Sequence, residues 1–82
     1  QFAGGQDSPD VVGGIVGTHC EVKYVERLNI YDAMGQAVKD AGDNLVPYVA
    51  HRRNNRHWLV TVRAINLLEF ATLISWDGID YD

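Results

Sequence analysis

The 82 residues of this chain, 46% of them hydrophobic, suffice for one small globular domain covering residues 1–82 and exclude a disordered chain. The net charge of −4 at pH 7 argues against a nucleic-acid partner unless basic side chains gather locally. Because Cys20 is the single cysteine and no apolar run approaches the roughly 20 residues of a membrane span, we exclude an intrachain disulfide and expect a soluble, cytoplasmic protein without a membrane partner.

The N-terminal part of the chain combines a polar loop with short apolar runs. Residues 1–10 are rich in glycine and polar side chains and are typical of a loop, in which Pro9 favours an extended backbone just before it. Residues 11–12 predict a short strand, the glycine pair 13–14 a turn, and residues 15–17 the start of a second strand.

Residues 18–25 have the pattern of a β-strand. Because side chains alternate between the two faces of a strand, His19, Glu21, Lys23 and Val25 are expected to share one side. At a rise of about 3.3 Å per residue, Glu21 and Lys23 would be about 6.5–7 Å apart along the strand. This separation would leave room for a metal ion and a phosphate oxygen between the tips of the two side chains.

A helix of about 12 residues follows. Asn29 is a good N-cap, Gly42 is a typical C-terminal stop, and the apolar residues between them recur at helical spacing. We therefore predict a helix over residues 30–41 with one buried stripe, and Gln36 lies off that stripe.

A predicted hairpin comes next. Residues 45–50 indicate a strand, and Pro47 places it at a sheet edge or near the start of the strand. Residues 58–62 indicate its partner, which leaves residues 51–57 as a long turn. Residues 65–74 then predict a helix that is apolar over most of its circumference, so we expect it to be buried or to meet a second chain.

The basic side chains of the hairpin turn are Arg52, Arg53 and Arg56. They would attract phosphate locally despite the negative total charge, because charges farther apart than about 8–10 Å are largely screened in physiological salt. The alternative is an ordinary solvated turn. Taken together, the order of elements predicts an α/β domain with a mixed sheet of about four strands flanked by helices.

Asp10, Glu21 and Lys23 form a candidate chemical site. Two carboxylates supply the oxygen ligands that a hard divalent cation needs, and a nearby ammonium group neutralises charge that develops on a phosphate in the transition state. Two ordinary alternatives stand beside this interpretation. Asp10 would cap its own loop, and Glu21 and Lys23 would form a surface ion pair worth at most about 1 kcal/mol.

These motifs also carry a family resemblance. Ser8-Pro9-Asp10-Val11-Val12 is followed by Glu21-Val22-Lys23, then by the helix with Gln36, and then by the hairpin strand Trp58-Leu59-Val60. In this order the sequence resembles the PD-(D/E)xK nuclease superfamily, and within it the small phage and prophage proteins similar to Holliday junction resolvases or VRR-NUC nucleases. The similarity spans about residues 1–70.

The resemblance implies a restriction-endonuclease-like core and a metal-dependent DNA endonuclease of a bacterial or phage-infected cell, with branched, Holliday junction-like DNA as one expected substrate. It assigns Asp10 and Glu21 as ligands of Mg²⁺ or Mn²⁺, the backbone carbonyl of Val22 as a further ligand, and Lys23 as the catalytic cation. The resemblance therefore predicts three catalytic residues, namely Asp10, Glu21 and Lys23. An oxygen-only ligand set suits magnesium or manganese.

Further residues are expected to support the site or to bind DNA. Gln36 matches a helix glutamine that supports the lysine or contacts DNA, and the arginines of the hairpin turn would contact DNA phosphates. His19 would support the site or contact DNA, with an ordinary strand histidine as the alternative. Trp58 is most simply explained as a core or interface aromatic residue.

One family element is expected to be absent. Relatives have a helix before the PD strand, which carries a glutamate of the metal site and basic residues that grip DNA, whereas this sequence starts at Gln1 with a predicted loop. The sequence would then be a fragment, a partner chain would supply the helix, or the protein would have lost it. The rival function is a nuclease-fold module that binds DNA or assembles without cutting, and a purely structural oligomer is a third alternative. A homodimer or higher homo-oligomer is expected for either of the first two.

Overall fold

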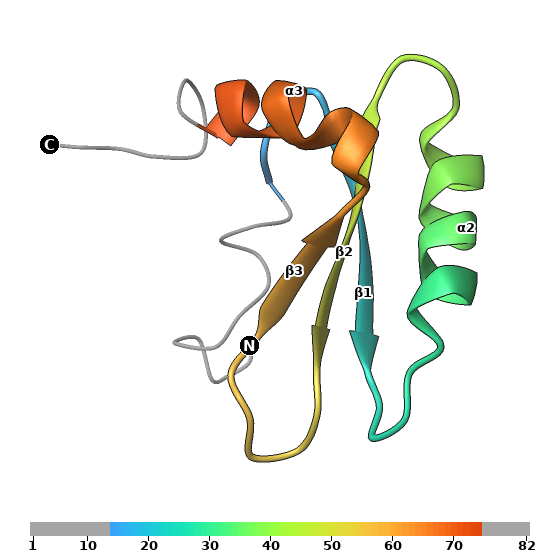
Figure 1. Cartoon of the computed structure of the whole chain (residues 1–82), viewed down its shortest axis with the longest axis vertical. Helices are drawn as coiled ribbons and strands as arrows, with labels where there is room; N and C mark the ends of the chain where they lie inside the picture. The colour runs from blue at the N-terminus through green and yellow to red at the C-terminus, as the bar shows by residue number, and fades with distance from the viewer. Residues whose placement is uncertain (1–13, 75–82) are drawn as a thin grey trace, which may run out of the picture.

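The structure, a computed structural model, describes residues 14–74 (Figure 1). The described elements follow in the order β1 (Thr18–Tyr24), α2 (Ile30–Ala41), β2 (Val46–Arg52), β3 (Leu59–Val62), the 3₁₀ turn η2 (Ala64–Asn66) and α3 (Leu67–Leu73). β1 pairs in parallel with β2, and β2 pairs antiparallel with β3, so β2 is the central strand. Residues 14–74 therefore form a small α/β domain with a mixed three-stranded sheet and two helices, and the strand expected at residues 11–12 lies outside the described residues.

Helix α2 has the predicted limits because both of its ends are capped. The Asn29 side chain accepts a hydrogen bond from the backbone N–H of Asp32 at 3.1 Å, which satisfies one of the free donors of the first turn. At the other end Gly42 has a positive φ of 68°, and its N–H donates to the carbonyl of Val38 at 3.2 Å. The helix buries a stripe of small and flexible residues against the sheet: Ala33, Met34, Ala37 and Ala41.

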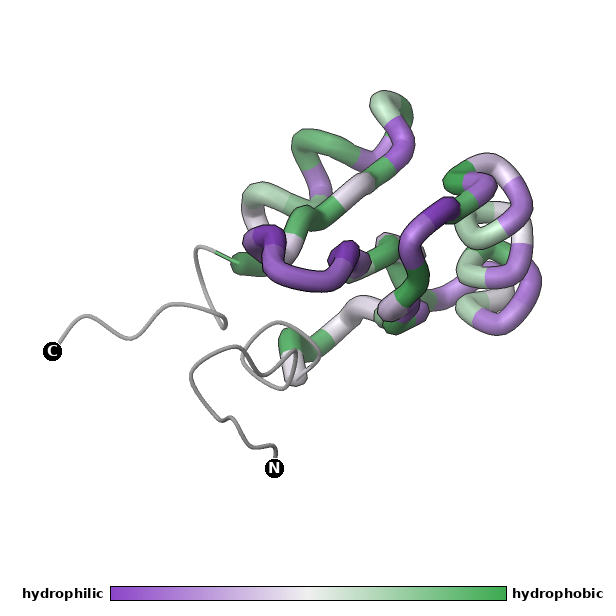
Figure 2. Tube along the Cα trace, turned by 90° about the horizontal axis from the view of Figure 1, so that it is seen from below, coloured by the Kyte–Doolittle hydropathy of each residue, from purple (hydrophilic) through white to green (hydrophobic). Residues whose placement is uncertain are grey.

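The two helices cover opposite faces of the sheet, as the view from below in Figure 2 illustrates. Successive residues of β2 supply both halves of the core, since alternate side chains point to opposite faces. Val49 packs with Ala33, Met34 and Ala37 under α2. Tyr48 packs with Phe70 of α3, with ring centroids 4.9 Å apart. β2 is buried from Val46 to Ala50, which fits its place between two strands and two helices.

Residues 15–17 form a turn instead of the start of a strand. The N–H and the hydroxyl of Thr18 both donate to the carbonyl of Ile15, at 3.3 and 2.6 Å, and Gly17 adopts a φ of 88° that favours glycine. We expected Pro47 either at a sheet edge or near the start of a strand. It is the second residue of the central strand β2, so the first alternative is wrong and the second is confirmed.

Helix α3 is largely exposed, so the expectation that the apolar helix is buried within the chain is wrong. Phe70 is its buried residue, whereas Leu68 is 81% exposed, and Ile65 in the preceding 3₁₀ turn η2 is 83% exposed. The physical reason is that a single stripe of the helix reaches the sheet, and apolar residues on its other sides have no described element to pack against. The alternative, contact with a second chain, stays a prediction. No helix among residues 14–74 has the length and apolar character needed to cross a bilayer.

Candidate functional site

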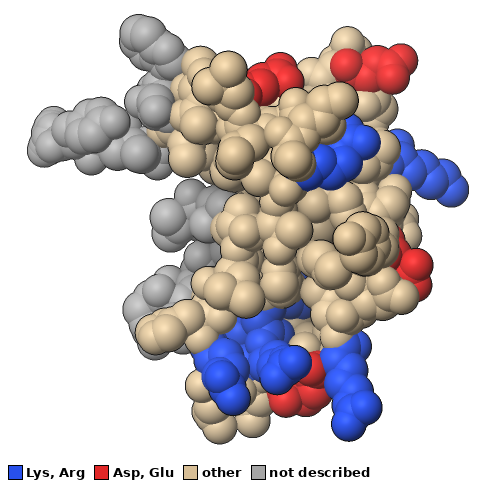
Figure 3. Space-filling view, viewed as in Figure 1, with Lys and Arg blue, Asp and Glu red and all other residues tan. Residues whose placement is uncertain are grey.

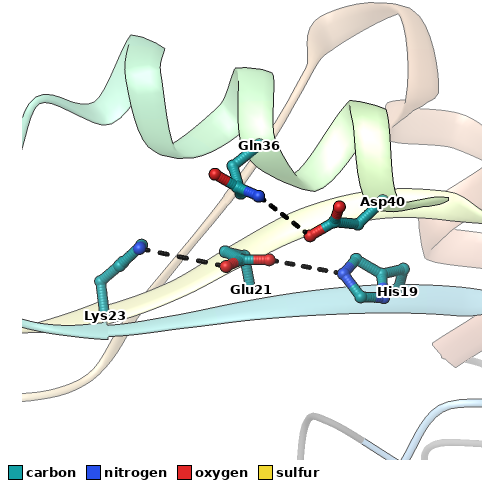
Figure 4. Close-up of polar contacts among 5 residues, drawn as sticks. All are labelled: His19, Glu21, Lys23, Gln36 and Asp40. Carbon is teal, nitrogen blue, oxygen red and sulfur yellow. Dashed lines mark hydrogen bonds and ion pairs between the residues drawn. The ribbon is translucent and has the colours of Figure 1, made fainter.

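Three polar side chains of β1 lie on the face covered by α2, as the strand alternation predicted (Figure 4). Glu21 is in the middle. Its Oε1 is 3.4 Å from Nε2 of His19, and its Oε2 is 3.9 Å from Nζ of Lys23. The Glu21 side chain is 20% exposed, so its carboxylate is held in a partly dehydrated place with a histidine on one side and an ammonium on the other.

Helix α2 brings two more polar groups to this cluster. Gln36 and Asp40 are four residues apart and therefore lie on the same side of the helix, and Nε2 of Gln36 donates to Oδ2 of Asp40 at 3.3 Å. Figure 4 shows both side chains above Glu21. The structure thus places Gln36 next to the predicted site, although its direct hydrogen bond is to Asp40 and not to Lys23.

Asp40 is the residue that the sequence prediction missed. One ligand atom each from His19, Glu21 and Asp40 lies within 4.8 Å of the others. The signal that would have found Asp40 is its spacing, because a helix that brings Gln36 to the site brings the residue four positions later as well.

The two carboxylates of this cluster are compatible with a magnesium or manganese ion. At Mg²⁺–oxygen distances of about 2.0–2.1 Å, two ligands on opposite sides of one ion are about 4.2 Å apart, so small side-chain rotations would bring these atoms into range. Two carboxylates suit a hard cation, while an imidazole is less typical of magnesium. His19 is better suited to orienting Glu21 from behind, a role that hydrogen-bonded partners of ligating carboxylates commonly have.

Lys23 and Glu21 are closer than the sequence spacing suggested. The predicted gap for an ion between their tips is closed, because the two long side chains bend toward each other and form an ion pair. A carboxylate has about four acceptor positions. With His19 and Lys23 on separate oxygens, Glu21 still has lone pairs for a further partner.

The other two assigned metal ligands are Asp10 and the backbone carbonyl of Val22. Asp10 lies outside the described residues. Val22 lies between Glu21 and Lys23 in β1, in register with Ala50 of β2. Its side chain points to the opposite face of the sheet, so only its backbone carbonyl is available for the assigned role.

Basic side chains gather at the carboxyl end of the sheet. Figure 3 shows them at the bottom of the molecule, where the loop between β2 and β3 lies in Figure 1. Arg53 and Arg56 are exposed residues of this loop. The loop is fixed to the end of β1, because the N–H of Asn54 donates to Oε2 of Glu26 at 2.6 Å and the Tyr24 hydroxyl donates to Oδ1 of Asn54 at 3.2 Å.

Arg52 differs from the two loop arginines. The sequence predicted Arg52 to be part of the turn, but it is the last residue of β2. Its guanidinium carbon lies 5.3 Å from the ring centroid of Tyr24 and 6.0 Å from that of Trp58, within the range of cation–π attraction. Trp58, which precedes β3, thus packs with Tyr24 and Arg52 at the end of the sheet.

Other titratable groups near the site are unsuited to act as nucleophile or cation. Burial is the main factor that raises the pKa of the Cys20 thiol, and the charge of Glu21 adds to it, so the thiolate is disfavoured. Burial also raises the pKa of the Tyr48 hydroxyl. Desolvation lowers the pKa of His51, whose Nε2 lies 2.8 Å from Oγ1 of Thr61. His51 is therefore mainly neutral at pH 7, and of these two neighbouring residues Lys23 is the one that supplies positive charge.

The chain matches no protein-family model, and no protein among the curated proteins or the solved structures shows significant similarity to it. The resemblance to the nuclease superfamily therefore depends on the motifs and their order.

Proposed function

We propose that this protein is a metal-dependent endonuclease of the PD-(D/E)xK type that hydrolyses phosphodiester bonds in DNA, including branched DNA. The observation that supports this function best is the convergence of the Glu21 carboxylate and the Lys23 ammonium on one face of β1, with Asp40 of α2 beside them. An acid and an amine that are two residues apart in a strand share a face by necessity. An ordinary surface ion pair would be more exposed and would have no second carboxylate, here that of Asp40, beside it.

In this proposal Glu21 and Asp10 would hold Mg²⁺ or Mn²⁺ together with the carbonyl of Val22, and Asp40 would add a carboxylate at the same place. The bound ion would supply an activated water and offset phosphate charge. His19 keeps the Glu21 carboxylate oriented through the 3.4 Å contact between Nε2 and Oε1. Gln36 keeps Asp40 in place through the hydrogen bond described above.

Lys23 provides the charge stabilisation. Its flexible side chain is 35% exposed, so the ammonium can leave Glu21 and reach a phosphate that approaches the open side of the cluster. There it would donate hydrogen bonds to an oxygen of the scissile phosphate as negative charge develops. Because this interaction is stronger in the transition state than in the bound substrate, it would act on the rate of cleavage more than on affinity.

A second candidate is a nuclease-fold module that binds DNA without cutting it. The observation in its favour is that both carboxylate oxygens of Glu21 already have side-chain partners within the protein, His19 and Lys23. The arginines at the end of the sheet would serve such a module as well as they would serve a nuclease.

The two functions are distinguished by cleavage assays on supercoiled plasmid and on a four-way junction, with Mg²⁺, Mn²⁺ or EDTA. We expect metal-dependent cleavage by the wild-type protein and its loss in Glu21→Gln, while Glu69→Gln, an exposed acid in the first turn of α3, retains activity. Calorimetric titration with Mn²⁺ should show binding that Glu21→Gln weakens. Binding of DNA without cleavage in any metal would favour the second candidate, and metal-dependent cleavage that Glu21→Gln leaves unchanged would refute the assigned site.

A further inference from the structure

A pocket of about 330 Å³ opens at the carboxyl end of the sheet, on the face that carries Lys23. Its wall includes Val25, His51, Arg53 and Arg56, together with Glu26. We call it the loop-arginine pocket. The loop that forms one side is fixed by the hydrogen bonds of Asn54 to Glu26 and Tyr24, so its arginines start from a defined position.

The loop-arginine pocket adjoins the proposed catalytic cluster. His51 is the direct neighbour of Lys23 across the parallel pair of strands, and adjacent strands are about 4.8 Å apart. Val25 follows Lys23 by two residues, a distance of about 6.6 Å along an extended chain. The pocket therefore begins next to Lys23: His51 borders it on the neighbouring strand, and Val25 borders it just beyond the carboxyl end of β1.

The charge of this pocket suits an anion. Neither Arg53 nor Arg56 forms an ion pair with any residue from 14 to 74. Arg27 lines an adjoining hollow together with Arg53 and Asn29, and Asn29 is the N-cap of α2, where the helix dipole contributes partial positive charge.

The one carboxylate in the pocket wall is that of Glu26. Its Oε2 accepts the N–H of Asn54, so this acid serves to hold the loop. His51 contributes little positive charge of its own, because desolvation lowers its pKa and favours the neutral ring. The two loop arginines therefore outweigh the single acid at this position.

We propose that the loop-arginine pocket binds a backbone phosphate one or two nucleotides away from the phosphate that is cleaved, so that the substrate strand runs from Glu21 along β1 toward the loop. The offset follows from the 6.6 Å between Lys23 and Val25, since one strand of duplex DNA advances about 3.4 Å per nucleotide. This inference rests on the proposed nuclease function. The aromatic residues of this end, Tyr24 and Trp58, do not line the pocket, so the recognition is of the backbone and not of the base sequence.

Binding of fluorescein-labelled duplex DNA in EDTA at several salt concentrations tests the contact itself. Each phosphate contact contributes about 0.9 to the slope of log K against log salt, so the double variant Arg53→Gln/Arg56→Gln should reduce the slope by about 1.8. The matched control Lys39→Gln/Arg63→Gln removes the same charge elsewhere and should leave the slope unchanged; Arg63 is held by Asn66 at the other end of β3. Equal slopes for the two double variants would overturn the proposal.

Neutral methylphosphonate linkages test the position. With Mg²⁺ and a substrate whose cut site has been mapped, one replacement within two nucleotides of the cut should slow the wild-type protein about tenfold or more, and the Arg53→Gln/Arg56→Gln variant should be insensitive to that replacement. If the wild type cuts but no replacement distinguishes it from the variant, the pocket proposal fails while the nuclease function stands. If the wild type does not cut at all, the nuclease function and the positional claim fail together, and the salt slope still reports whether the arginines contact phosphate.

Discussion

Replacing Lys23 by glutamine separates the proposed catalytic role of this side chain from its contribution to stability. In the folded protein the ammonium forms one ion pair, at 3.9 Å to Glu21, and the side chain is 35% exposed. The pair is partly exposed to solvent, so it contributes at most about 1 kcal/mol to the free energy of unfolding. For a domain of this size, that corresponds to a decrease in Tm of at most about 4–8 °C.

The effect of Lys23→Gln on cleavage should be far larger. A positioned group that stabilises developing charge in the transition state typically accounts for a factor of about 10²–10³ in rate, or about 2.7–4 kcal/mol. Because the ammonium would act mainly on the additional negative charge of the transition state, beyond the single charge that the bound phosphodiester already carries, kcat should fall much more than the affinity for DNA. The ratio between the two effects is what distinguishes a catalytic lysine from a surface lysine.

The assay compares kcat, DNA affinity and Tm for wild type, Lys23→Gln and Lys39→Gln. Lys39 is the other lysine of the sequence and an exposed residue in the last turn of α2, so its replacement makes the same change of charge away from Glu21. We expect Lys39→Gln to cleave at close to the wild-type rate. Equal activity of the two variants, or a loss in Lys23→Gln that merely follows a loss of folded protein, would refute the reasoning.

Three further predictions concern the scaffold. Asn29→Ala removes the side-chain cap of α2 and should lower the free energy of unfolding by about 1 kcal/mol, measured by urea denaturation, with the exposed Asn44→Ala close to wild type. Ala37→Leu inserts three carbons into a fully buried contact of α2 and should cost about 1–3 kcal/mol, whereas Leu at the exposed Ala64 should cost little. An NMR titration of His51 should give a pKa below the ordinary value of 6.5, because desolvation disfavours its charged form. The part of the free energy of unfolding that depends on neutral His51 is therefore fully present above pH 6.5 and is lost as the pH falls through the lowered pKa. A midpoint at or above 6.5 would contradict that environment.

Local signals were enough to predict α2 and the face of β1. The limits of α2 follow from Asn29 and Gly42, whose effects are confined to the adjacent turn. The shared face of His19, Glu21 and Lys23 follows from strand alternation, which depends on the backbone alone. Both predictions needed no knowledge of what packs against these elements.

Tertiary contacts account for what the sequence prediction missed. Asp40 became a candidate site residue because α2 lies over β1, and in the sequence its four-residue spacing from Gln36 is the one local sign of that arrangement. Residues 65–74 show the opposite problem: an apolar pattern is the same whether a helix is covered or exposed, and here Ile65 and Leu68 stay exposed. Arg52 joined β2 because pairing with Tyr24 of β1 extends the strand beyond its apolar run.

The parallel pairing of β1 and β2 explains why Lys23 and a basic loop lie together in this small domain. Parallel strands end at the same edge of the sheet, so the loop after Arg52 emerges beside Tyr24, next to Lys23. Had β2 run antiparallel to β1, the same loop would emerge near Thr18, and the six residue steps of β1 would put it roughly 20 Å from Tyr24. Helix α2 makes the parallel connection possible, and its N-terminus lies at that same edge. The proposed path of the substrate strand therefore depends on the strand–helix–strand unit as a whole, and a change that preserved Lys23, Arg53 and Arg56 but disrupted α2 should abolish their joint action on DNA.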